Sequence, residues 1–138
     1  MSIDKLLSEF EELEDWEEKC DFLIDLGLDL PEFPDDLKRD EYIVHGCQSL
    51  VWLVTKPVEQ DGVKVIRIEA DSDALIVKGL IVVLLATYSG RTPQQILDTD
   101  INALFERMGL NQHLSSTRRN GLYGMVQQVR GFADLHAV

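Results

Sequence analysis

The sequence predicts an α+β fold in which helices from both ends of the chain pack on a small antiparallel sheet of about three strands. Apolar residues recur at helical spacing in the N-terminal and C-terminal parts, whereas three β-like runs occupy the middle. The length of 138 residues suits one compact domain that needs no disulfide or metal cross-link. We therefore expect a single domain over residues 1–138.

The N-terminal part should contain two helices and an extended connector. The apolar residues of the first helix follow helical spacing, at Ile3, Leu6, Leu7, Phe10 and Leu13. The second helix should begin at Asp15, which starts a capping-box pattern, and stop at Gly27. Pro31 and Pro34 then break the helical pattern, so residues 28–40 should be extended with one short turn.

Three β-like runs follow, at residues 42–45, 50–58 and 63–70. Asp61-Gly62 lies between the last two runs, and this dipeptide strongly favours a tight hairpin turn. Apolar and polar residues largely alternate in the third run, which indicates that one face of that strand contacts water. Cys47 falls at the junction of the first two runs.

Capping residues predict the helices of the C-terminal part. Ser72 or Asp73 should cap a helix that extends to about residue 89. Three more helix starts are expected further along the chain, at Thr92, Asp100 and either Ser115 or Ser116. The order of helices, strands and helices again favours the α+β class.

The formal net charge is -12, which argues against nucleic acid as a partner because phosphate binding needs clustered Lys and Arg. Such a charge suits a partner with a basic face, or it simply favours solubility. The longest apolar stretch, residues 74–87, is interrupted by Lys78 and is shorter than a bilayer requires, so no membrane association is expected. No signal peptide is visible, and two cysteines without an export signal indicate free thiols in the cytoplasm.

Cys47 is the candidate reactive residue. Gly46 before it leaves the sulfur uncrowded, and Gln48 and Ser49 after it bring polar groups where a structural cysteine would have apolar neighbours. Cys20 instead falls on the apolar stripe of the second helix, where a free cysteine acts as a small hydrophobe. The residues alone leave open that Cys47 is an inert strand residue.

Other chemistries find little support. The potential metal ligands are scattered along the chain, so no dedicated metal site is expected: Cys20, His45, Cys47, His113 and His136. His45 lies two residues from Cys47, as the base of a thiol hydrolase could, but no orienting Asn or Asp is recognisable. No Gly-rich nucleotide-binding motif is present.

Arg118 and Arg119 fall in the first turn of the last predicted helix, where the helix dipole disfavours cations. One of them could face an anion or a thiolate, whereas the alternative is a solvated surface pair. Gly121 and Gly124 in the same helix suggest close packing, which we expect against the sheet.

Three separated blocks resemble the SufE family of sulfur-acceptor proteins, which includes the CsdE-like proteins. The blocks are Gly46-Cys47-Gln48-Ser49-Leu50-Val51-Trp52-Leu53, Ser72-Asp73-Ala74-Leu75-Ile76-Val77-Lys78-Gly79-Leu80 and His113-Leu114-Ser115-Ser116-Thr117-Arg118-Arg119-Asn120-Gly121-Leu122. Gln48-Ser49 favours the SufE-like over the CsdE-like branch. Ser116 stands where many members have Pro, which affects only the helix start.

The resemblance implies that Cys47 is the persulfide-forming residue and that the chain is an accessory protein rather than an enzyme. Its partner would be a pyridoxal-phosphate cysteine desulfurase, SufS-like or CsdA-like, which the chain would stimulate. An iron-sulfur scaffold would receive the sulfur downstream. This chain would need no cofactor, because the pyridoxal phosphate belongs to the partner.

The resemblance also implies where the desulfurase docks. The docking and supporting residues would be His45, Gly46, Gln48, Ser49, Asp73 and Arg118, and Arg119 is the more variable of the two arginines. A homodimer stays open, as does the alternative of a non-catalytic adaptor in which Cys47 is only structural.

Overall fold

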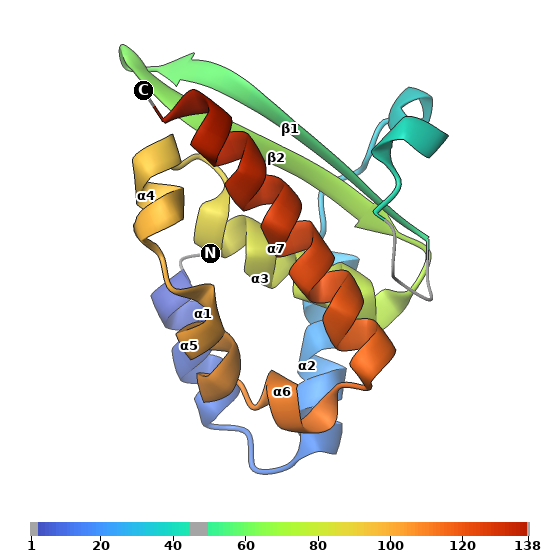
Figure 1. Cartoon of the computed structure of the whole chain (residues 1–138). Coiled ribbons are helices and arrows are strands. Elements are labelled where there is room, and N and C mark those ends of the chain that lie inside the picture. Colours follow the sequence, from blue (N-terminus) through green and yellow to red (C-terminus); the bar gives the residue numbers. More distant parts are fainter. Residues whose placement is uncertain (1–2, 45–49, 138) are drawn as a thin grey trace.

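The computed structural model describes residues 3–44 and 50–137, and it confirms the α+β class (Figure 1). Helices from both ends of the chain lie on one side of a two-stranded antiparallel sheet (Figure 1). The elements are α1 (Ile3–Glu11), α2 (Trp16–Leu28), the 3-10 turns η1 (Asp35–Leu37) and η2 (Asp40–Tyr42), β1 (Val51–Gln60), β2 (Val63–Ser72), α3 (Leu75–Tyr88), α4 (Pro93–Asp98), α5 (Ile101–Arg107), α6 (Leu110–His113) and α7 (Ser116–His136).

The hairpin of β1 and β2 forms where the sequence predicts it. The register pairs Val51 with Ser72 at one end and Gln60 with Val63 at the other. Asp61 and Gly62 both have positive φ, 53° and 79°. This is the turn geometry that matches the right-handed twist of the strands and that Asp-Gly readily adopts.

The predicted first strand, residues 42–45, is wrong in its described part. Tyr42 ends the turn η2, and Ile43 forms only an isolated bridge with Trp52 of β1. The N–H of Ile43 donates to Asp40 O at 3.2 Å and closes the turn η2, and the next residue, Val44, already donates to Val51 O of β1 at 2.9 Å. The described part of this segment therefore goes from a turn directly into a single bridge and does not form a strand. His45 lies outside the described residues.

The core lies between one face of the hairpin and the helices. In Figure 1, α7 runs alongside the hairpin; α7 contacts β1, α3 contacts β2, and the two helices also touch. Gly121 is among the buried residues of α7. The close approach to the sheet that Gly121 and Gly124 suggest stays a prediction. The four elements β1, β2, α3 and α7 contribute many residues to the hydrophobic core, among them Val51, Leu53, Ile66, Ile68, Leu80, Ile81, Leu84, Leu122, Met125 and Val129.

Two buried glycines let α2 and α3 approach closely. A Cβ atom added to Gly79 would lie 2.0 Å from the carbonyl oxygen of Leu23, and one added to Gly27 would lie 2.8 Å from Lys78 Cβ. The prediction that Gly27 ends its helix is wrong by one residue, because α2 continues to Leu28. Gly27 is needed for the packing of α2 against α3. The sequence pattern suggested only that a glycine ends the helix, and it could not show the contact with α3.

Most predicted helix starts are confirmed. The side chains of Asp15, Thr92, Asp100 and Ser115 accept hydrogen bonds from backbone N–H groups in the first turn of α2, α4, α5 and α7. α6 is an additional turn that the sequence analysis did not predict; it follows Gly109, whose φ of 72° separates it from α5. Within the described ranges, no helix is both long and apolar enough to cross a membrane.

Candidate functional site

Five of the predicted site residues lie outside the described residues: His45, Gly46, Cys47, Gln48 and Ser49. The structure does describe the residues on both sides of them, Val44 and Leu50. It also describes Asp73 and Arg118, so the surroundings of the candidate site can be built from these four positions.

The chain enters the candidate site from a fixed point. The N–H of Val44 donates to the carbonyl oxygen of Val51 at 2.9 Å, beside the Ile43–Trp52 bridge. Both valines are buried, with 2% and 0% of their surface exposed. The backbone is therefore held against the edge of β1 immediately before the segment 45–49.

The chain leaves the candidate site through a second fixed point. The N–H of Leu50 donates to Asp73 Oδ1 at 3.1 Å, and the N–H of Asp73 donates to Leu50 O at 3.2 Å. Asp73 thus binds the backbone three residues after Cys47, through both its own main chain and its side chain.

The prediction that Ser72 or Asp73 caps α3 is wrong. The N-cap position belongs to Ala74, whose side chain has no acceptor, and Ser72 still belongs to β2. Ser72 Oγ instead accepts from Ala74 N at 3.2 Å. A long-range partner, the Leu50 N–H, competes for the Asp73 carboxylate and removes it from the helix end.

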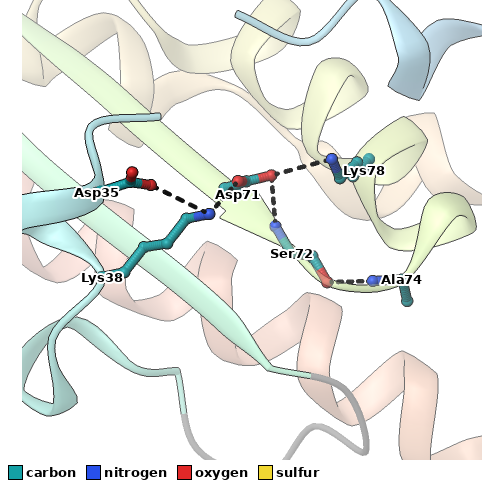
Figure 2. Close-up of polar contacts among 6 residues, drawn as sticks. All are labelled: Asp35, Lys38, Asp71, Ser72, Ala74 and Lys78. Atoms are coloured by element: carbon teal, nitrogen blue, oxygen red, sulfur yellow. Dashed lines mark hydrogen bonds and ion pairs between the residues drawn. The ribbon is translucent and has the colours of Figure 1, made fainter. Parts of the chain in front are cut away.

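A cluster of charged side chains lies where β2 leads into α3, and the sequence analysis did not predict it (Figure 2). Asp71 is only 9% exposed, and its carboxylate faces Lys38 Nζ and Lys78 Nζ, each at 3.6 Å. Asp71 Oδ1 also accepts from Ser72 N at 2.8 Å. The predicted third run stopped at residue 70, directly before Asp71, whereas β2 continues to Ser72. Aspartate is disfavoured in strands unless it has a specific partner, so local residue preferences gave little signal for this cluster.

The two arginines at the start of α7 differ in their contacts. Arg119 Nη1 donates to the carbonyl oxygen of Asn111 at 3.0 Å, while Tyr123 Oη donates to Asn111 Oδ1 at 2.8 Å. Arg119 therefore ties α7 to α6. Considering only residues that the structure describes, the Arg118 guanidinium makes no hydrogen bond or ion pair, and no described contact joins it to Leu50 or Asp73.

Cys20 is half-buried rather than fully buried as the apolar stripe suggests. The buried positions of α2 are Leu23, Leu26 and Gly27, so Cys20 lies beside the core face. Burial, followed by the negative charge of Asp21, raises the pKa of the Cys20 thiol, although the Arg118 charge opposes this. A raised pKa leaves less thiolate at neutral pH, which supports a structural role.

The described part of the chain contains no group of three or more His, Cys, Asp or Glu residues placed to hold a metal ion. Two of the candidate ligands make ring contacts instead. His113 stacks on Trp16 with ring centroids 4.7 Å apart, and the ring centroids of His136 and Phe132 are 4.5 Å apart.

Comparisons with known proteins agree with this architecture. The chain is 40% identical over 136 residues to an uncharacterized SufE-like protein from Rhizobium etli, covering 99% of this chain and 92% of that protein. A solution structure of a hypothetical protein from Thermus thermophilus has the same fold, with a TM-score of 0.75, 19% identity and coverage of 99% and 98% of the two chains. The family model of the Fe-S metabolism associated domain matches residues 4–133. The chain therefore belongs to the SufE family and has a role in iron-sulfur metabolism.

Proposed function

We propose that this protein is a sulfur acceptor and carrier that acts in the cytoplasm through Cys47. It takes persulfide sulfur from a pyridoxal-phosphate-dependent cysteine desulfurase, stimulates that enzyme and passes the sulfur on for iron-sulfur cluster assembly. Family membership supports the metabolic setting. The observation that most supports the site is the pair of anchors, Val44 on Val51 and Leu50 on Asp73, on either side of Cys47.

The anchors restrict where a sulfur donor must dock. Cys47 is three residues from Val44 and three from Leu50, and consecutive Cα atoms are about 3.8 Å apart, so its Cα lies within about 11 Å of both anchors. Leu50 and Leu75 are 47% and 51% exposed near the second anchor. They would supply apolar contact area for a desulfurase that reaches Cys47, because burying apolar surface is the main driving force of association.

The distribution of charge suggests the character of the partner surface. Residues 1–41 contain sixteen of the 25 acidic residues and only four of the 13 basic ones, so they carry the entire net charge of -12. These residues form α1, α2 and the connector. A desulfurase with a basic rim around its active site would be steered towards this part of the chain, more strongly at low salt.

The transfer requires no oxidant. The Cys47 thiolate attacks the outer, sulfane sulfur of the donor's persulfide, the S–S bond of the donor breaks, and the donor cysteine leaves as a thiolate. Cys47 then carries the persulfide, and a second displacement of the same kind passes the sulfur to the next acceptor. Electrons and atoms balance in each step, and this chain contributes only the nucleophile and its placement.

Mass spectrometry after incubation with cysteine and a desulfurase tests the proposal. We expect a gain of one or more sulfur atoms on the peptide that contains Cys47, no gain in Cys47→Ser, and retained gain in Cys20→Ser, which is the matched control. Binding and stimulation of the desulfurase without any mass gain on Cys47 would instead establish the adaptor alternative. Assays with SufS-like and CsdA-like enzymes in parallel would identify the preferred partner.

A further inference from the structure

The carboxylate of Asp71 occupies an unusual position for an acidic residue. Its side chain is only 12% exposed, yet it stands one residue before the end of β2, close to the start of α3. Burying a carboxylate is costly unless charged or polar partners compensate for the lost water. Two lysines and a backbone N–H compensate here, which makes Asp71 the centre of a network rather than one half of a surface ion pair.

The first branch of this network reaches the entry side of the candidate site. Lys38 belongs to the connector, six residues before Val44, and its Nζ lies 3.6 Å from Asp71 Oδ2. The same Nζ lies 5.4 Å from the ring centre of Trp52, which pairs with Asp71 across the hairpin and bridges to Ile43. Lys38 therefore fixes the connector against both strands just before the chain reaches Val44.

The second branch reaches the exit side. Asp71 Oδ1 accepts from Ser72 N at 2.8 Å and lies 3.6 Å from Lys78 Nζ in the first turn of α3 (Figure 2). Ser72 Oγ in turn accepts from Ala74 N. These contacts fix the short link between β2 and α3 on both sides of Asp73, the residue that binds Leu50.

We propose that Asp71 is a positioning residue for sulfur transfer. It ties the connector, the hairpin and α3 together, so the two ends of the segment that carries Cys47 keep a constant separation and direction. This proposal rests on the proposed function of Cys47. Because a small misplacement of a reacting group can lower a rate by up to about 100-fold, the main consequence should be on the transfer step rather than on docking.

The variant Asp71→Asn tests the proposal, because it retains the size and one oxygen acceptor for Ser72 N but removes the charge that both lysines face. We expect the single-turnover rate of persulfide transfer at saturating desulfurase to fall about tenfold, with the apparent KM changed less than about twofold. Glu69→Gln is the matched control: Glu69 lies two residues earlier on the same face of β2 and pairs with Lys56 at 3.2 Å. Its transfer rate should stay within about twofold of the wild type.

Hydrogen exchange supplies a measurement that needs no desulfurase. The Leu50 amide, bonded to Asp73, should exchange faster in Asp71→Asn than in the wild type or in Glu69→Gln. Lys38→Met, which keeps an apolar side chain near Trp52, is the second variant if Asp71→Asn does not fold, and it should show the same two changes in weaker form. Equal Leu50 exchange in all folded variants would overturn the positioning role even if Cys47 proved not to accept sulfur. Normal exchange with a lost transfer rate would also overturn it.

Discussion

Replacing Gly79 by Ala tests whether the α2–α3 contact depends on a missing side chain. The new Cβ would lie 2.0 Å from the carbonyl oxygen of Leu23 and 2.6 Å from its carbonyl carbon, whereas ordinary contact begins at 3.4 Å. These atoms are backbone, so no side-chain rotation can relieve the clash. The helices would have to move apart by roughly 1.4 Å, which is the difference between an ordinary contact of 3.4 Å and the 2.0 Å that separates the new Cβ from the Leu23 oxygen.

The expected energy follows from two opposing effects. Overpacking a tight contact costs about 1–3 kcal/mol, and a rigid backbone neighbour favours the upper end of this range. Alanine gains about 1 kcal/mol over glycine inside a helix. We therefore expect Gly79→Ala to lower the free energy of unfolding by about 2 kcal/mol.

Gly131→Ala provides the matched control, because an added Cβ there has no atom within 4 Å and the position lies inside α7. This variant should be about 0.5–1 kcal/mol more stable than the wild type. Urea unfolding followed by circular dichroism measures both changes through the midpoint and slope. If Gly79→Ala were as stable as Gly131→Ala, the reasoning from the close helix contact would be refuted.

Three further predictions concern the two arginines of α7, the exposed Leu75 and the thiol of Cys20. Arg118→Ala should leave stability almost unchanged but slow sulfur transfer. Arg119→Ala should lower the free energy of unfolding by about 1 kcal/mol, because it removes the hydrogen bond to α6, and should leave transfer intact in the folded protein. The reversed pattern in thermal melting and transfer assays of the two variants would refute this prediction. Leu75→Ala should raise the apparent KM for the desulfurase while Leu135→Ala, at a position 77% exposed on α7, should not; equal KM values in steady-state kinetics would argue against the docking face. Burial raises the Cys20 pKa, so alkylation of Cys20 in the Cys47→Ser background should accelerate at a higher pH than alkylation of a free cysteine. Arg118→Ala should shift this pH still higher, because the Arg118 charge lowers the Cys20 pKa; a pH profile of the alkylation rate that is the same with and without Arg118 would contradict this.

The sequence by itself determined the features that depend on neighbouring residues. The Asp61-Gly62 turn depends on the backbone dihedral angles of these two residues. The helix caps depend on hydrogen bonds between residues that are three apart in the chain, at Asp15, Thr92 and Ser115. The residue types therefore suffice to predict both features. The α+β class was predictable for the same reason, because helical and alternating spacings are local patterns. The choice of Cys47 as the candidate reactive residue rests on its immediate neighbours and on the three blocks that resemble the SufE family, and it stays a prediction.

Only the tertiary structure decided the roles of residues with two competing interpretations. Gly27 could end a helix or admit a neighbouring one, and the second holds because α3 packs against it. Asp73 could cap α3 or bind elsewhere, and its carboxylate accepts a hydrogen bond from the N–H of Leu50, 23 residues earlier in the chain. Asp71 meets Lys38 and Lys78 only after the connector, hairpin and α3 have come together. Each outcome depends on a contact distant in sequence, which local residue preferences cannot encode because they do not specify which segments meet in space.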